Sequence, residues 1–240
     1  MRIDVYPKNS KLLDNHVFTS TVIVIDVLRA TTSITMALKN GAEKIIPARD
    51  AGEAVDIFSK LNLGDCVMAG ERGGLKLPDF QLGNSPLEFT ESAVNGKTVI
   101  FSTSNGTAAI HNAKSAKNCI LGAMINRTAI AKKALSMLDD VIILCAGTDD
   151  IIGADDIVAA GAIIDAITKN AVCAIELTDI AFICESLYES YIRGQFKLNK
   201  TMHYRHLCEL NLLSDIEFSF KTDLTDIVPV YRNGIIEKSC

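Results

Sequence analysis

The stretch that points most directly to the fold is residues 21–33, with the sequence TVIVIDVLRATTS. Its first five residues are all β-branched, and such a run predicts a strand buried on both faces of a sheet. The polar residues Asp26 and Arg29 follow, and Thr31-Thr32-Ser33 then favours the start of a helix over residues 31–40. We therefore expect this stretch to form a strand, a short polar loop and a helix in succession.

The same alternation of an apolar run and a helix-period segment recurs along the chain. Further strands are expected at residues 44–47, 65–69, 97–101 and 140–144. Further helices are expected at residues 50–61, 106–114 and 155–169. This alternation predicts an α/β fold with a mainly parallel or mixed sheet, helices on both faces, and an active site at the carboxyl ends of the strands.

The remaining segments are less regular. Residues 73–96 are rich in Gly, Pro and Asn, which predicts an ordered loop with one short helix from Pro86. Residues 176–213 are expected to be helical, and residues 215–232 irregular or an edge strand, so that the C-terminal quarter caps the sheet. We expect residues 1–240 to form a single α/β domain, or two closely packed lobes divided near residue 170.

Composition and charge exclude several classes of protein. The formal net charge is −5 and the Lys and Arg residues are not clustered, which argues against a nucleic-acid partner. No segment approaches the roughly 20 apolar residues of a membrane-spanning helix, and no apolar run follows the first charges. We therefore expect a cytoplasmic protein with neither a membrane nor a nucleic-acid partner.

The seven cysteines are scattered without Cys-x-x-Cys or Cys/His spacing, so a disulfide framework is not expected. Cys145 ends an apolar run, which makes it the one candidate nucleophile among them. It lacks the His-x-Cys-x5-Arg loop by which thiol phosphatases activate such a residue. We therefore expect Cys145 to be a core residue.

Polar residues gather directly after four of the expected strands. They are Asp26, Arg29, Thr31, Thr32 and Ser33; Glu71 and Arg72; Ser102, Thr103, Ser104, Asn105, Gly106 and Thr107; and Gly147, Thr148, Asp149, Asp150, Asp155 and Asp156. If the strands are parallel, these clusters share one edge of the sheet and can meet in one cleft. Carboxylates bind Mg²⁺, Arg side chains match phosphate oxygens, and helix N-termini attract anions. The combination indicates a phosphate ester bound beside a hard cation.

Each cluster also has a purely structural explanation. Asp26 could cap the following helix, and Asp155 and Asp156 could complement a helix dipole. Asp149 and Asp150 are expected to be solvated. His203 and His206 are three residues apart, which is typical of one face of a surface helix.

The motifs together resemble the 2-phosphosulfolactate phosphatase family. The resemblance is carried by the blocks VIDVLRATTS at 24–33, GERGG at 70–74, LGNSPLE at 82–88, STSNGT at 102–107, CAGT at 145–148, and Asp155-Asp156 ahead of Ala160-Gly161-Ala162. It implies a Mg²⁺-dependent phosphatase that converts (2R)-phosphosulfolactate to 3-sulfolactate and phosphate, a step of coenzyme M biosynthesis. Where this family usually has Glu-Asp, the present chain has Asp155-Asp156.

From these residues and the resemblance we assign provisional roles. The expected catalytic residues are Asp26, Arg29, Glu71 and Arg72, and the expected Mg²⁺ ligands are Asp26, Glu71, Asp155 and Asp156. The expected substrate-binding residues are Thr31, Thr32, Asn84, Ser102, Thr103, Asn105, Gly106, Thr107 and Gly147. The partner is then a small anionic phosphorylated substrate, and a homodimer is compatible with the size of the chain.

Several alternatives stay open at this point. The nucleophile is either a metal-bound water or the carboxylate of Asp26. A haloacid-dehalogenase-like phosphatase would need a second Asp at position 28, where this chain has Leu28. A non-catalytic anion-binding protein would use the same cleft but has little use for so many carboxylates.

Overall fold

A computed structural model describes residues 1–240 except 11–14, 62–63 and 240. The strands in this part of the chain are β1 (Arg2–Tyr6), β2 (Thr21–Ile25), β3 (Lys44–Pro47), β4 (Cys66–Arg72), β5 (Leu75–Lys76), β6 (Thr98–Ser102), β7 (Asn118–Gly122), β8 (Val141–Cys145), β9 (Glu176–Leu177), β10 (Pro229–Arg232) and β11 (Ile235–Lys238). The α-helices are α1 (Ala30–Lys39), α2 (Ala51–Ser59), α3 (Glu91–Val94), α4 (Gly106–Asn112), α5 (Arg127–Met137), α6 (Ala154–Asn170), α7 (Asp179–Ile192), α8 (Met202–Glu209) and α9 (Leu213–Ser219). The expected α/β fold with an open, mixed, mostly parallel sheet is confirmed.

The strand β2 shows why its sequence forms a central strand. Its side chains alternate between two layers, with Ile23 and Ile25 on one face and Val22 and Val24 on the other. The first face packs against α5, α6 and α7, and the second against α1 and α4. All five residues of β2 are buried, as the run of β-branched residues predicted.

The sheet consists of two parallel groups joined by an antiparallel hairpin. The strand order is β5-β4-β6-β3-β11-β10-β7-β2-β8-β1-β9. The hairpin of β10 and β11 pairs antiparallel with β7 on one side and with β3 on the other. The expectation that residues 215–232 are irregular or an edge strand is confirmed for residues 221–228. It is wrong at both ends, because residues 213–219 form α9 and β10 lies in the middle of the sheet.

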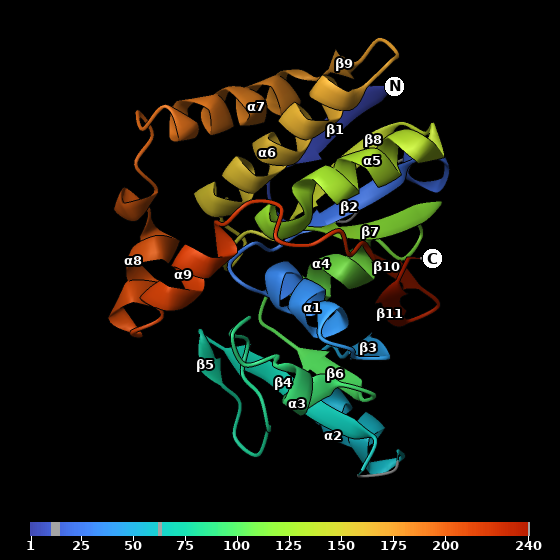
Figure 1. The fold of residues 1–240 in the computed structure, drawn as a ribbon, viewed down its shortest axis with the longest axis vertical. Coiled ribbons are helices and arrows are strands. Elements are labelled where there is room, and N and C mark those ends of the chain that lie inside the picture. The colour runs from blue at the N-terminus through green and yellow to red at the C-terminus, as the bar shows by residue number, and fades with distance from the viewer. Residues whose placement is uncertain (11–14, 62–63, 240) are drawn as a thin grey trace.

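The strands of one parallel group therefore point in the opposite direction to those of the other group where the two groups meet the hairpin. Polar residues at their carboxyl ends still meet, and the twist of the sheet explains how. Neighbouring strands turn by roughly 20–25°, so the five steps from β6 to β2 rotate the strand direction by more than a right angle. In Figure 1, β4 and β6 in the lower part of the molecule are inclined to β2 and β7 in its upper part.

Two smaller expectations also need correction. The short helix of the 73–96 segment is α3, which begins at Glu91 after Thr90 and not at Pro86. The strand β4 continues to Arg72, so Glu71 and Arg72 lie inside the strand rather than after it. The strands β1 and β7 were not expected from the sequence.

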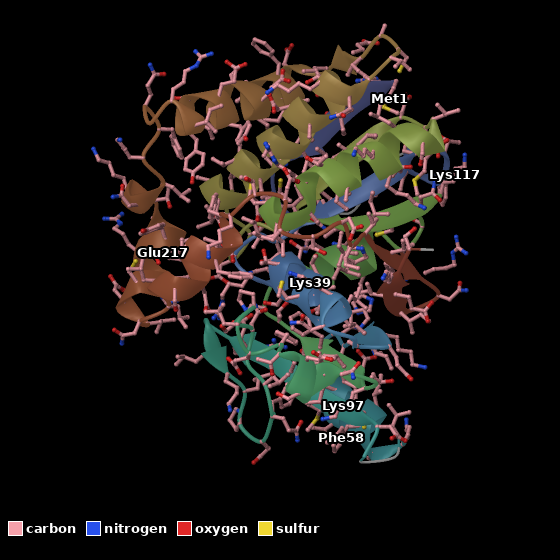
Figure 2. All side chains as sticks on the ribbon, viewed as in Figure 1. Met1, Lys39, Phe58, Lys97, Lys117 and Glu217 are labelled. Atoms are coloured by element: carbon pink, nitrogen blue, oxygen red, sulfur yellow. The ribbon has the colours of Figure 1, made fainter. Side chains whose placement is uncertain are left out.

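Side chains fill the space between the sheet and the helices that cover it (Figure 2). One face of α9 is buried and the other is exposed, because Asp215 is 2% exposed whereas Glu217, labelled in Figure 2, faces outward.

Within the residues that the structure describes, no helix combines the length and the apolar character needed to cross a bilayer.

Candidate active site

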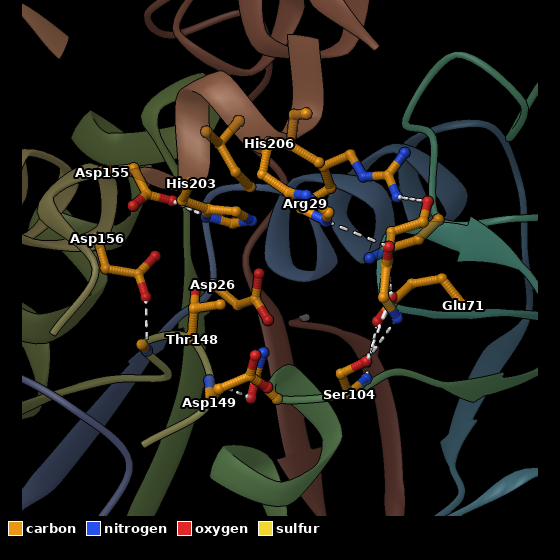
Figure 3. Close-up of a pocket in the computed structure, with 17 residues that line it drawn as sticks. Asp26, Arg29, Glu71, Ser104, Thr148, Asp149, Asp155, Asp156, His203 and His206 are labelled. Atoms are coloured by element: carbon orange, nitrogen blue, oxygen red, sulfur yellow. Dashed lines mark hydrogen bonds and ion pairs between the residues drawn. The ribbon is translucent and has the colours of Figure 1, made fainter. Parts of the chain in front are cut away.

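The polar clusters from both parallel groups line one pocket of about 110 Å³, a volume that restricts the site to a small molecule. Figure 3 shows Asp26 near its centre, Asp155 and Asp156 on one side, and Glu71 and Ser104 on the other. Eight residues assigned from the sequence are among those that line it: Asp26, Arg29, Glu71, Asn84, Asn105, Gly147, Asp155 and Asp156.

Asp26 follows the last residue of β2 and is 7% exposed. Its Oδ1 accepts a hydrogen bond of 3.1 Å from the backbone N–H of Ala30, so the capping role that the sequence suggested is present. Its Oδ2 accepts no hydrogen bond among the described residues. Burial raises the pKa of Asp26 to about 6, against the opposing effects of the Ala30 N–H and the charge of His203.

Gly106 provides the room that the Asp26 carboxylate occupies. A Cβ atom at this position would lie 2.6 Å from Asp26 Oδ2 and 2.6 Å from the Cβ of Ala30. Both neighbours are held in place, the first by its bond to Ala30 and the second by the start of α1. Gly106 therefore shapes the pocket from behind.

Replacing Gly106 with alanine is expected to displace Asp26 and to lower the free energy of unfolding by about 1–3 kcal/mol, as overpacking does in a close-packed interior. Urea denaturation measures this effect. Gly64→Ala is the matched control, because a Cβ at Gly64 meets nothing within 4 Å. Equal effects of the two substitutions would contradict the proposed role of Gly106.

Asp155 and Asp156 begin α6 and are 2% and 3% exposed. Asp156 links the loops after β2 and β8, because its Oδ1 accepts from the N–H of Val27 and its Oδ2 from the N–H of Gly147, both at 2.9 Å. Burial first, and then the charges of Asp155 and Asp26, raise the pKa of Asp156 well above its ordinary value. Asp156 thus holds the two loops together.

Asp155, in contrast to Asp156, makes no hydrogen bond to the backbone of the two loops. Its Oδ2 lies 2.9 Å from Nδ1 of His203, while its Oδ1 is buried without a hydrogen-bond partner. Two further pocket residues, Asn84 and Thr148, also have a buried side-chain oxygen without a partner. Buried polar atoms in folded proteins are nearly always paired, so these three oxygens are the atoms that an ordered water or a polar ligand in the pocket would contact.

Glu71 organises the opposite wall of the pocket. Its Oε1 accepts 2.7 Å from the N–H of Ser104, and its Oε2 accepts 2.7 Å from the N–H of Gly74. Both oxygens therefore hold the backbone of two loops, one after β4 and one after β6. This arrangement explains why a carboxylate at 71 is 6% exposed without a cation beside it.

Arg29 lines the pocket at the start of α1. Its Nη1 forms a buried ion pair of 2.7 Å with Asp215 of α9, and its Nη2 donates 2.7 Å to the carbonyl of Gly74. The guanidinium has five N–H groups in all, so it retains donors for an anion after these two contacts.

The other residues assigned from the sequence lie behind the pocket wall. Arg72 donates to the carbonyl of Glu71 and to the hydroxyl of Ser102. Thr31, Thr32, Thr103 and Thr107 use their hydroxyls to bond backbone groups of the same loops. They fix the geometry of the loops, and their direct contact with a substrate stays a prediction.

The sequence did not identify His203 and His206 as site residues. The expectation of a surface helix face is wrong for His203, whose side chain is 18% exposed and contacts Asp155. His206 lies 3.4 Å from the carbonyl of Gly73, and both histidines line the pocket. No local motif could reveal this, because α8 reaches the pocket from 48 residues beyond Asp155. Although burial lowers the pKa of His203, the hydrogen bond and charge of Asp155 outweigh this effect and raise it.

Asp149, Asp150 and Cys145 have the exposure that the sequence predicted. Asp149 and Asp150 are exposed, and Asp150 pairs with Lys8 at 2.6 Å, while Asp149 also borders the pocket. Cys145 is fully buried, and burial raises its pKa well above the ordinary value, so it is a core thiol. The seventh cysteine, Cys240, lies outside the described residues.

Two carboxylates of the pocket retain an oxygen of the type that binds Mg²⁺. In the described part of the chain, no three His, Cys, Asp or Glu side chains form a ligand group. Mg²⁺, however, is commonly held by one or two carboxylates, with waters and substrate phosphate completing its shell. Asp26 and Asp155 have an oxygen free for this purpose, whereas both oxygens of Glu71 and of Asp156 already accept backbone hydrogen bonds.

Comparison with known proteins gives a consistent result over the whole chain. The family model described as 2-phosphosulpholactate phosphatase matches residues 8–234. A protein of Clostridium tetani named probable 2-phosphosulfolactate phosphatase is 38% identical over 237 residues, covering 99% of this chain and 100% of that protein. Proteins with the same name from Clostridium novyi and Caldanaerobacter subterraneus subsp. tengcongensis are 40% and 37% identical, over 99% and 100% of this chain and 100% and 99% of their own lengths.

Proposed function

Because the chain belongs to the 2-phosphosulpholactate phosphatase family, we propose that it is a Mg²⁺-dependent phosphatase that hydrolyses (2R)-phosphosulfolactate to 3-sulfolactate and phosphate. The observation that carries this proposal is the meeting of Asp26, Arg29 and Asp155, with their unused donors and acceptors, in one small pocket. A substrate with three anionic groups matches a site that offers both a guanidinium and a place for a cation.

Asp26 and Asp155 would hold the Mg²⁺ ion. When bound, the ion supplies positive charge that neutralises the phosphate oxygens as the P–O bond breaks. Without such a cation, the carboxylates of this pocket would repel an anionic substrate. For the same reason a non-catalytic anion-binding protein is disfavoured, because the five carboxylates that line the pocket would be a disadvantage to it.

Arg29 would bind one anionic group of the substrate with its remaining N–H donors. Its position is fixed by Asp215 and Gly74, so little side-chain entropy is lost when the substrate binds. The backbone carbonyl of Asn84 accepts 2.7 Å from the hydroxyl of Ser33, and the side-chain amide of Asn84 offers a neutral polar contact in the same pocket. Both residues orient the substrate rather than react with it.

Asp26 is the residue placed to take part in the chemistry itself. With Oδ2 on the ion, its Oδ1, which accepts from the N–H of Ala30, would either attack phosphorus or accept a proton from the attacking water. Borohydride reduction during turnover separates these two versions, because an aspartyl phosphate would be reduced to homoserine at position 26. Mass spectrometry of the peptide containing residue 26 gives the answer.

The test of the proposed function is phosphate release from (2R)-phosphosulfolactate, with and without Mg²⁺. Phospholactate, which lacks the sulfonate, is the matched comparison substrate. We expect release that requires Mg²⁺ and is faster with the sulfonated compound. Folded protein that releases no phosphate from either compound in the presence of Mg²⁺ would contradict the proposal and favour the binding-protein alternative.

Cytoplasmic location, a homodimer and the lack of a nucleic-acid partner stay predictions. The lack of a nucleic-acid partner rests on the net charge of −5, the cytoplasmic location on the sequence of the apolar segments, and the homodimer on the size of the chain alone.

A further inference from the structure

We propose that His203 is a positioning residue that fixes the Asp155 carboxylate for binding of the metal ion. This inference rests on the proposed function, because it concerns how one of the two Mg²⁺ ligands is oriented. It adds a role for the helix α8, which the motifs of the chain do not assign.

The contact between His203 and Asp155 is direct and largely enclosed. The Nδ1 atom of His203 lies 2.9 Å from Asp155 Oδ2, and the two side chains are 18% and 3% exposed. An ionised carboxylate only accepts hydrogen bonds, so Nδ1 carries the proton in this pair. Figure 3 shows the His203 ring extending from Asp155 toward the middle of the pocket.

The two oxygens of Asp155 are thereby distinguished. Oδ2 is hydrogen-bonded to the imidazole of His203. Oδ1 is buried and has no hydrogen-bond partner, although Asp155 lines the pocket. The neighbouring Asp156 differs in that both its oxygens bond backbone N–H groups. Asp155 is therefore the carboxylate of α6 that is free to accept a ligand, and His203 is its hydrogen-bonding support.

Outer hydrogen bonds of this kind fix the orientation of a metal-binding carboxylate. Their removal typically lowers metal affinity by about 10–100-fold without removing a ligand. His203 comes from a different part of the chain than Asp155, so the bond also ties α8 to the start of α6. We expect loss of the bond to weaken metal binding, even though His203 itself does not contact the metal.

The test measures binding of Mn²⁺ alone to the full chain, by the electron paramagnetic resonance signal of the free ion. His203→Leu removes the donor and keeps an apolar side chain of similar size, and His203→Ala removes it with less bulk. His203→Asn retains an amide N–H near the position of Nδ1. Met202→Ala is the matched control, because Met202 is the preceding residue of α8 and is 74% exposed.

We expect His203→Leu and His203→Ala to weaken Mn²⁺ binding by about 10–100-fold. His203→Asn should restore most of the affinity, and Met202→Ala should leave it unchanged. Circular dichroism confirms that each variant is folded, so that only folded variants are compared.

Three outcomes would overturn the inference. The first is wild-type affinity in the folded Leu and Ala variants, and the second is an Asn variant as weak as these two. The third is wild-type protein that does not bind Mn²⁺ at all, which would also remove the metal site from the proposed function. If instead all variants bind Mn²⁺ as expected but wild type releases no phosphate, the positioning role stands and the proposed reaction fails.

Discussion

Replacing Asp26 with asparagine is expected to lower the rate of phosphate release by roughly a hundred- to ten-thousand-fold, which is the usual contribution of a positioned acid or base. The Asn side chain retains an oxygen that can accept from the N–H of Ala30, so the loop after β2 keeps its hydrogen bond. Release is measured at saturating (2R)-phosphosulfolactate and Mg²⁺. A variant with wild-type turnover would show that Asp26 is only a helix cap.

The same substitution is expected to raise the unfolding free energy of the metal-free protein at neutral and alkaline pH. Burial raises the pKa of Asp26 from 3.8 to about 6. Between these values the folded carboxyl keeps a proton that the unfolded chain has lost, so the stability it contributes at low pH is lost as the pH rises through about 6. The corresponding loss is on the order of 3 kcal/mol, and asparagine, which does not ionise, avoids it.

Urea denaturation in the presence of a chelator measures this difference at several pH values. The Asp26→Asn variant should exceed wild type in unfolding free energy at pH 8 and differ little from it at pH 4. A difference that is the same at both pH values would contradict the explanation by ionisation. The activity and stability results together would identify Asp26 as a residue retained for chemistry at a cost in stability.

Replacement of Asp215 is expected to cause a large loss of unfolding free energy. Its carboxylate forms the buried ion pair with Arg29 and also accepts 2.7 Å from the hydroxyl of Ser85. Replacing Asp215 with leucine leaves the guanidinium of Arg29 buried without a counter-charge, and such changes cost about 3–5 kcal/mol. The loss of unfolding free energy is measured by urea denaturation at neutral pH.

Two further variants isolate the cause. Ser85→Ala removes the hydroxyl bond to Asp215, together with the 3.3 Å bond that the hydroxyl accepts from the N–H of Leu87, and should cost roughly 2 kcal/mol while leaving the Arg29 ion pair in place. The double variant Arg29→Met with Asp215→Leu removes both charges and should be more stable than Asp215→Leu alone. An Asp215→Leu variant no less stable than Ser85→Ala would show that the buried charge is not the cause.

The sequence predicted well those features that depend on neighbouring residues. The β-branched run of β2 and the polar loop after it are local patterns, and both are found where expected. Residues that follow the strands do line one pocket, although the strands form two groups rather than one. The ends of the expected strands therefore predicted the location of the pocket, and the division of the mixed sheet into two parallel groups was not predicted.

Other features could not be predicted because they depend on contacts between distant segments. Nothing near residue 203 indicates that its imidazole meets Asp155, and nothing near residue 229 indicates that β10 lies between β7 and β11. The roles of the carboxylates were also hidden. Glu71 and Asp156 bond backbone N–H groups while Asp155 retains a free oxygen, and these differences depend on loops distant in the sequence.

The central position of the C-terminal hairpin affects how the chain can fold during synthesis. The edges of β3 and β7 that the hairpin covers are made long before residues 229–238 leave the ribosome. Until then each half of the sheet exposes an unpaired edge, which is a surface prone to pairing with other chains. The two groups of strands therefore keep these edges unpaired until residues 229–238 emerge, and a chain truncated before residue 229 would leave both edges open.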